Sequence, residues 1–247
     1  MMLPELAVDT AAVVVTGLFR PEVMTPKWLR DQDLISRDDF DECVIEQVAA
    51  FATVLNLPHL ALTVTTDRIQ VLSREDGIAE QARDLIMGIL RSVPDDTPVA
   101  SLGINRMVHF ICDSDTAYHA IGDRLAPKNH WNKLLGPSGT NDLQIRGARK
   151  DGWRGSVVVQ VQPSTGIPLG VFVALNDHFA LVPDTSSLDA RSPRFSAHLQ
   201  PVAGEAERLP EKRLAALDVL VTCWADSRSK SDEVISMVAS LGHGSGG

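Results

Sequence analysis

The sequence predicts an α+β fold, a single two-layer sandwich in which a mostly antiparallel sheet carries its helices on one face. The first observation is that β-branched segments follow one another with short connections, which favours antiparallel pairing. The second is that amphipathic helical segments separate these strand groups. The third is a composition of 44% hydrophobic and 22% charged residues in 247, typical of a globular protein with a sizeable core.

The chain opens with a strand followed by a helix. Residues 11–19 are rich in β-branched side chains and predict the strand. After a loop, Ser36 and Asp39 form a capping-box variant, which predicts a helix that closes at Pro58. Its apolar stripe recurs at three- and four-residue steps and consists of Phe40, Cys43, Val44, Val48, Phe51 and Leu55.

A hairpin and a second helix complete the first half. Apolar and polar residues alternate over 60–71, which predicts the hairpin. Ser73 and Asp76 mark the start of the next helix, which has an apolar stripe over 78–90 and ends before Pro94.

The second half begins with the longest strand, which we predict over residues 97–112. Asp113 or Ser114 caps a short helix after it. Three strands in meander order follow, with Asp151 and Gly152 as a tight turn between the first two. We place these strands at residues 143–148, 156–162 and 169–175.

Composition divides the chain into three parts. Residues 1–182 form the α+β core domain, and residues 183–209 form a flexible polar excursion rich in Ser and Pro. Residues 210–247 form C-terminal helices that pack on the core and a mobile Gly-rich tail, with Pro210 opening one helix and Ser231 the next. The two halves share a strand–helix–hairpin–helix rhythm, which could reflect an internal duplication.

Charge and cysteine content bound the function classes. A net charge of −9 argues against nucleic acid as a partner, because such binding leaves a basic footprint. The cysteines are few, odd in number and set in apolar patterns, so we expect buried reduced thiols; they are Cys43, Cys112 and Cys223. The N-terminus lacks the pattern of a signal peptide, and no apolar run reaches 18 residues. We therefore expect a soluble cytoplasmic protein without a membrane partner.

Polar side chains in the middle of the longest strand are the most suggestive feature. Asn105 and His109 fall on one face of that strand and Arg106 on the other. Similar residues follow near the end of the meander, and the candidate ligand-binding group is Asn105, Arg106, His109, Asn176, Asp177 and His178. An arginine on an apolar face needs a carboxylate or an anionic ligand. The structural alternative is that Arg106 pairs with a carboxylate such as Asp177.

Other constellations predict little chemistry. The histidines at 109, 119 and 130 are spaced 10 and 11 residues apart, which fits no metal-site template. The sequence contains no phosphate-binding glycine loop, dinucleotide fingerprint or nucleophile elbow. We expect no metal and no cofactor, and the sequence leaves open whether the chain is an enzyme.

Four short motifs resemble a bacterial protein family that has no assigned activity. They are P-K-W-L at 26–29, G-I-N-R-M-V-H-F at 103–110, L-A-P-K-N-H-W at 125–131 and N-D-H-F at 176–179. The resemblance covers roughly residues 12–182. It implies a bacterial source and supplies no chemistry.

The leading functional hypothesis is a non-enzymatic interaction protein or complex subunit. It would bind a protein partner or self-associate through the 183–209 excursion and the C-terminal helices. The alternative is a binder of small anionic ligands, or an enzyme, that uses Arg106, His109, Asp177 and His178. A third hypothesis, an acidic protein that occupies the nucleic-acid site of another protein, is permitted by the charge of −9.

Overall fold

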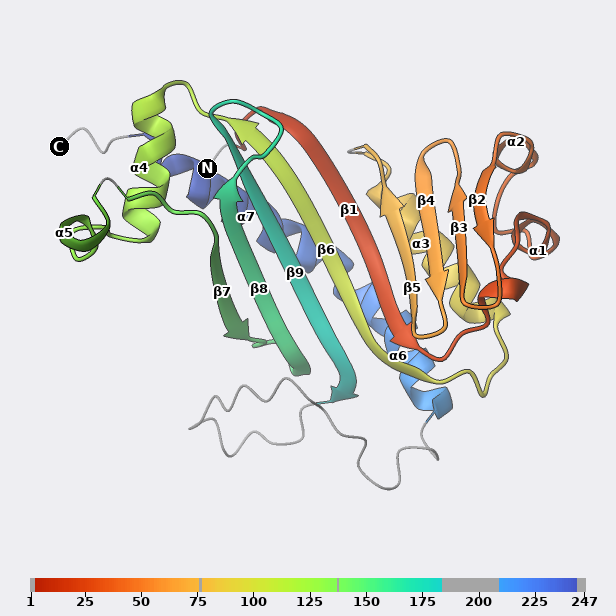
Figure 1. Cartoon of the computed structure of the whole chain (residues 1–247). Coiled ribbons are helices and arrows are strands. Elements are labelled where there is room, and N and C mark those ends of the chain that lie inside the picture. Colours follow the sequence, from red (N-terminus) through yellow and green to blue (C-terminus); the bar gives the residue numbers. More distant parts are fainter. Residues whose placement is uncertain (1–2, 76, 137, 184–208, 244–247) are drawn as a thin grey trace.

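A nine-stranded antiparallel sheet dominates the computed structural model, which describes residues 3–75, 77–136, 138–183 and 209–243 (Figure 1). The strand order is β2-β3-β4-β5-β1-β6-β9-β8-β7. The strands are β1 (Leu6–Gly17), β2 (Val44–Val48), β3 (Ala52–Asn56), β4 (Leu60–Thr65), β5 (Arg68–Ser73), β6 (Val99–Ile111), β7 (Leu143–Ala148), β8 (Trp153–Pro163) and β9 (Gly170–Pro183). The predicted α+β class is confirmed.

The described residues form seven α-helices and one 3-10 helix. They are η1 (Pro21–Val23), α1 (Pro26–Asp31), α2 (Arg37–Asp41), α3 (Ala79–Ser92), α4 (Asp115–Leu125), α5 (Asn132–Leu135), α6 (Leu209–Thr222) and α7 (Trp224–Ser240). α3, α6 and α7 pack against the central strands, behind the sheet in the view of Figure 1. We call the covered side the helix face. Its apolar side chains, such as Val13, Val15 and Ile104, are almost completely buried.

The central pair β1–β6 positions the candidate residues. The two strands run antiparallel over most of their length, with Val13 opposite Ile104. β5 flanks β1, and β9 flanks β6. Because side chains alternate along a strand, every second residue of these long strands points away from the helices.

The helix predicted between Ser36 and Pro58 is wrong over most of its length. Ser36 and Asp39 do form the capping box, but α2 ends at Asp41. The chain then forms the hairpin β2–β3. β-branched residues at 44, 45, 48, 53 and 54 favour strand over helix, and β2 is an exposed edge strand with no alternating burial to reveal it.

The second predicted helix is confirmed as α3, although its start differs. Ile78 precedes the first turn. Ser73 instead ends β5, where its hydroxyl accepts a hydrogen bond from the Ala11 amide and donates one to the Ala11 carbonyl. Asp76 lies outside the described residues.

The second half follows the predicted order with longer elements. Ser114 caps α4 by accepting a hydrogen bond from the Ala117 amide. β9 continues eight residues beyond the predicted end at 175, and α7 begins at Trp224 instead of Ser231. α6 and α7 pack against the sheet. The predicted excursion at 183–209 falls almost entirely outside the described residues. Of the cysteines, Cys112 is buried, whereas Cys43 and Cys223 are partly exposed.

The two halves have similar topologies, with a meander of four strands in the first half and of three in the second. Each begins with a central strand, β1 or β6, which is followed by short helices and an antiparallel meander. The last strand of each meander, β5 or β9, returns to pair with the first strand of its own half. A helix on the helix face then follows. The predicted strand–helix–hairpin–helix rhythm is thus replaced by a strand, short helices, a meander and a helix in each half.

Candidate functional site

The sheet has a second face, which no described helix covers (Figure 1). We call it the open face. The strand register and the alternation of burial give its members on the five central strands: Arg68, Gln70, Leu72, Thr10, Ala12, Val14, Thr16, Ser101, Gly103, Asn105, Met107, His109, Phe172, Ala174, Asn176, His178, Ser156, Val158, Gln160 and Gln162. The five strands contain two carboxylates, Asp9 and Asp177. Both point to the helix face.

Arg106 lies on the helix face in a buried ion-pair network. Its side chain is 4% exposed. Its guanidinium donates to both carboxylate oxygens of Asp9, at 3.0 and 2.6 Å, and to Asp232 on α7. A further bond of 3.2 Å reaches the Ser231 hydroxyl. Burial works to lower the pKa of Arg106, and the hydrogen bonds to Asp9 and Asp232 outweigh it, so the pKa lies above its ordinary value.

Asp177 forms a second network on the same face. Its carboxylate is fully buried and accepts from Arg149 and, at 3.3 Å, from Lys230 on α7. Arg149 also pairs with Asp151, and its guanidinium lies 3.5 Å from the centroid of the Phe179 ring. The two networks together fasten α7 and the β7–β8 turn to the sheet.

The structure therefore divides the predicted ligand-binding group. The expectation that Arg106 and Asp177 join the histidines at one site is wrong, because alternation turns those two side chains to the helix face. The structural alternative is correct in kind, since Arg106 is paired internally. Its partners, however, are Asp9 and Asp232 and not Asp177.

Four members of the predicted group share the open face: Asn105, His109, Asn176 and His178. Asn105 stands directly opposite Asn176 on β9, and Gly103 stands opposite His178. The Asn105 side chain lies close to Gly103: a Cβ added to Gly103 would be 3.6 Å from Asn105 Nδ2. The buried Asn105 Oδ1 has no hydrogen-bond partner among the described residues. This acceptor is therefore unsatisfied at the centre of the open face.

Both histidines of the open face have lowered pKa values. Burial lowers the pKa of His109. Burial, followed by the positive charges of Arg146 and Arg149, lowers the pKa of His178, and Asp177 opposes this. His109 contacts the Ser164 hydroxyl at 2.9 Å and packs on Phe172 with ring centroids 5.0 Å apart. At neutral pH both rings are uncharged hydrogen-bonding groups.

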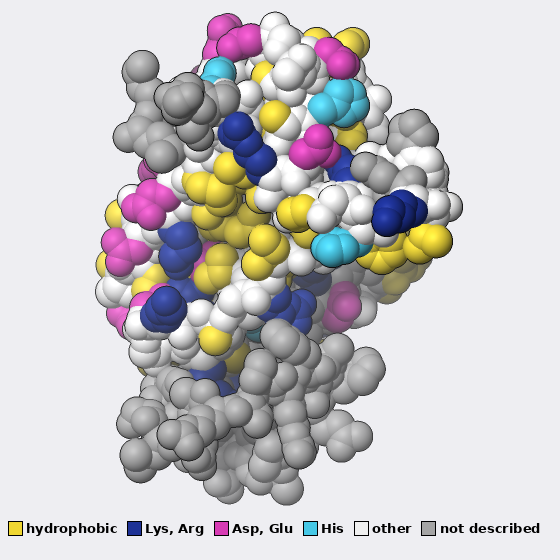
Figure 2. Space-filling view, turned by 90° about the vertical axis from the view of Figure 1, so that its left-hand side faces the viewer, with side chains coloured by type: hydrophobic (Ala, Val, Ile, Leu, Met, Phe, Trp, Pro, Cys, Tyr) yellow, Lys and Arg dark blue, Asp and Glu magenta, His cyan; other side chains and the backbone are white. Residues whose placement is uncertain are grey.

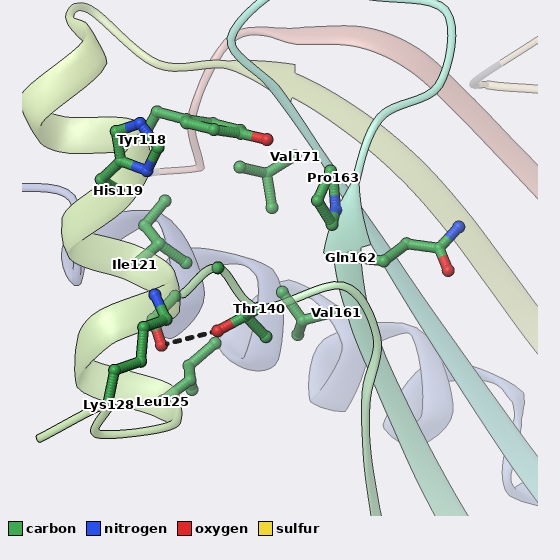
Figure 3. Close-up of a pocket in the computed structure, with 12 residues that line it drawn as sticks. Tyr118, His119, Ile121, Leu125, Lys128, Thr140, Val161, Gln162, Pro163 and Val171 are labelled. Carbon is green, nitrogen blue, oxygen red and sulfur yellow. Dashed lines mark hydrogen bonds between the residues drawn. The ribbon is translucent and has the colours of Figure 1, made fainter. Parts of the chain in front are cut away.

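The largely apolar cavity at one end of the sheet was not foreseen from the sequence. It lies between α4 and the ends of β8 and β9, with a volume of about 230 Å³ (Figure 3). Lys128 and Thr140, from the segments around α5, supply polar groups to its lining. In the sequence, the glycine at position 122 inside a predicted helix could have signalled that other groups, here Thr140 and Lys128, approach the helix closely.

The end of the molecule that carries α4, α5 and β7 also exposes apolar side chains. Figure 2 shows hydrophobic side chains gathered at the centre of this end, with charged side chains of both signs around them. Its large exposed apolar residues are Trp131, Leu134, Leu135 and Ile145.

Fold and site define an α+β protein with one helix-covered and one open sheet face. A comparison with protein-family models finds none that matches this chain, and a comparison with curated proteins finds no match either. No helix among the described residues has the length and apolar composition needed to cross a membrane.

Proposed function

We propose that this protein is a non-enzymatic binding module, a subunit of a complex that receives a protein partner on its open face. One observation carries the proposal: the central strands turn their carboxylates inward and present an uncovered surface made mostly of amides, hydroxyls, imidazoles and apolar groups, with Arg68 at one side. Such groups form hydrogen bonds without the desolvation cost of buried charge.

The size of the open face favours a macromolecule over a small ligand. Nine strands spaced about 4.8 Å apart make the sheet roughly 38 Å wide. The strands contain 5 to 14 residues, so even the shortest spans roughly 17 Å. The area of the face is therefore at least roughly 650 Å², which approaches the ~800 Å² that one partner contributes to a standard protein interface.

The charge of the open face narrows the chemistry of the partner. On the open face the central strands present no carboxylate, although the chain has a net charge of −9. The charged groups at its borders have both signs: Arg68 and Arg146 are balanced by Glu46, beside Asn56 on β3, and by Asp142, which accepts from Gln144 and Gln160. The partner would therefore be a protein surface whose hydrogen-bonding groups are mostly neutral.

The alternative function, an anionic-ligand site of Arg106, His109, Asp177 and His178, lacks geometric support. Arg106 and Asp177 have internal partners on the opposite face of the sheet from His109 and His178. A ligand on either face would contact half of the group.

Site-specific photo-crosslinking tests the proposal. A photoreactive residue replaces Val158 on the open face, and a control replaces Val221, which is 65% exposed on α6. In native extract, position 158 should give a discrete adduct that position 221 does not. The partner identified in that adduct should, once purified, bind the unmodified protein with a measurable Kd. Val158→Asp should raise this Kd at least ~10-fold, and Val221→Asp should leave it unchanged. Equal effects of the two substitutions would contradict the proposal.

A further inference from the structure

The cavity beside α4 is built from five separate segments of the chain. α4 supplies one wall, the ends of β8 and β9 supply the opposite wall, and the segments on either side of α5 close the lower side (Figure 3). Among the open-face residues of the central strands, Gln162 at the end of β8 is the one that lines it, and the cavity contains no residue of β6.

The walls of this cavity are mainly aliphatic. Ile121, Val161 and Val171 are almost completely buried. They belong to the smaller of two hydrophobic cores on the helix face, which also contains residues of β6 and α7. Leu125 and Pro163 complete the apolar lining. Because its walls belong to this core, the cavity is largely preformed, as small-molecule sites usually are.

The volume sets the size of a ligand. A cavity of roughly 150 Å³ lined by aliphatic and aromatic side chains accommodates benzene. The volume of about 230 Å³ therefore suits roughly nine non-hydrogen atoms, such as an aromatic ring with one substituent or a short acyl chain.

One end of the cavity is polar. The Lys128 side chain is 13% exposed, and its ammonium group pairs with Asp123. The Thr140 hydroxyl donates to the Gly122 carbonyl at 3.1 Å. A Cβ on Gly122 would lie 3.0 Å from Thr140 Oγ1 and 3.4 Å from Lys128 Nζ, so this glycine lets both groups approach the helix. An ammonium group has three donors, and Asp123 uses one of them.

Tyr118 adds a second polar group at the mouth. Figure 3 shows its ring lying across the upper part of the cavity, with the hydroxyl pointing toward the side of Val171 and Pro163. Its hydroxyl has no hydrogen-bond partner among the described residues. The ring covers the apolar floor while the hydroxyl remains free to bind a ligand.

We propose that this cavity binds a small monocarboxylate with an apolar body, of the size of benzoate or octanoate. The apolar body would occupy the space between Ile121, Val161 and Val171, and the carboxylate would accept from Lys128. A charge-assisted hydrogen bond in a mostly apolar site supplies both orientation and selectivity for the anion.

Calorimetric titration with benzoate and octanoate, beside the neutral benzyl alcohol and octanol, tests this assignment. We expect saturable binding of a carboxylate with a Kd of about 1 mM or tighter. Lys128→Met should weaken carboxylate binding about 10-fold or more while changing alcohol binding less than about 2-fold. The matched control Lys133→Met, an exposed lysine on α5, should change neither.

Two further variants separate loss of the site from loss of the fold. Leu125→Trp fills the cavity from a partly exposed position and should abolish binding of both ligand types at an unchanged thermal midpoint. Asp123→Asn frees the Lys128 ammonium and should tighten carboxylate binding. No saturable binding of either carboxylate to the unmodified protein, or equal binding by the Lys128→Met variant, would overturn the proposal.

Discussion

Asp177 shows how a single buried charge organises its surroundings. Its carboxylate joins Arg149 of the β7–β8 turn and Lys230 of α7 to a central strand. When one partner of a buried ion pair is removed, the remaining charge stays buried without compensation, and the folded state loses several kcal/mol of stability. The buried charged side chains of the central strands therefore stabilise the fold through internal ion pairs.

We expect Asp177→Asn to lower the free energy of unfolding by about 3 kcal/mol, because it leaves Arg149 and Lys230 without their shared buried partner. Urea denaturation measures the difference. Asp84→Asn, at an exposed carboxylate of α3, is the matched control and should change stability by less than about 0.5 kcal/mol. Similar effects of both variants would show that the network does not contribute.

His178 predicts a pH dependence of stability. Its pKa is lowered in the folded state, so near and below the ordinary value of about 6.5 the unfolded chain binds a proton that the folded chain does not. Stability should fall as the pH decreases through this window toward the lowered pKa. Denaturation at pH 7.5 and about 5.5 should show a smaller loss for His178→Gln than for the unmodified protein. Equal losses would show that His178 does not titrate in this way.

At this scale, the sequence predicted the faces of the candidate side chains on the longest strand but not the partners of those side chains. The alternation of side chains correctly placed Asn105 and His109 on one face of the strand and Arg106 on the other. The partners of Arg106 lie 97 and 126 positions away along the chain, so no local pattern could identify them. The short predicted strand at 169–175 also hid the fact that Asn176, Asp177 and His178 alternate between faces.

At the scale of elements, Gly155 fixes the bulge that starts β8. The register of β8 on β9 shifts between Trp153 and Gly155. Gly155 has a φ of +143°, and a Cβ there would lie 2.0 Å from the His178 carbonyl oxygen. Only glycine fits this close approach.

Gly155→Ala should therefore destabilise the protein by more than about 2 kcal/mol, because the new methyl group collides with backbone that cannot move aside cheaply. Gly147→Ala on β7, where an added Cβ meets no atom within 4 Å, should be nearly neutral. Thermal denaturation of both variants compares them. A neutral Gly155→Ala would show that the bulge relaxes.

Element prediction failed where burial carried no signal. α3 and β6 were predictable because their apolar periodicity matches their burial. In β2, most side chains are exposed, and its apolar residues combine with those of β3 into a false helical period. These residues form strands and not a helix because β3 pairs with β4, and this pairing is a tertiary effect that no local pattern reveals.

At the scale of the whole molecule, one sheet separates two kinds of chemistry. Ionic networks and both hydrophobic cores lie on the helix face, whereas the open face presents mostly uncharged hydrogen-bonding groups along its central strands. The repeated topology places the two halves side by side, so that β1 and β6 form the middle of a continuous surface. A surface of this extent is the basis of the proposed protein-binding function.

Methyl NMR of the reconstituted complex tests this central claim most directly. Met107 lies on the open face, and Met237 is partly exposed on α7, so the two methyl groups report on opposite sides of the sheet. Titration of methyl-labelled protein with the purified partner should shift or broaden the Met107 signal and leave the Met237 signal in place. A shift of Met237 without a change at Met107 would place the partner on the helices and contradict the account.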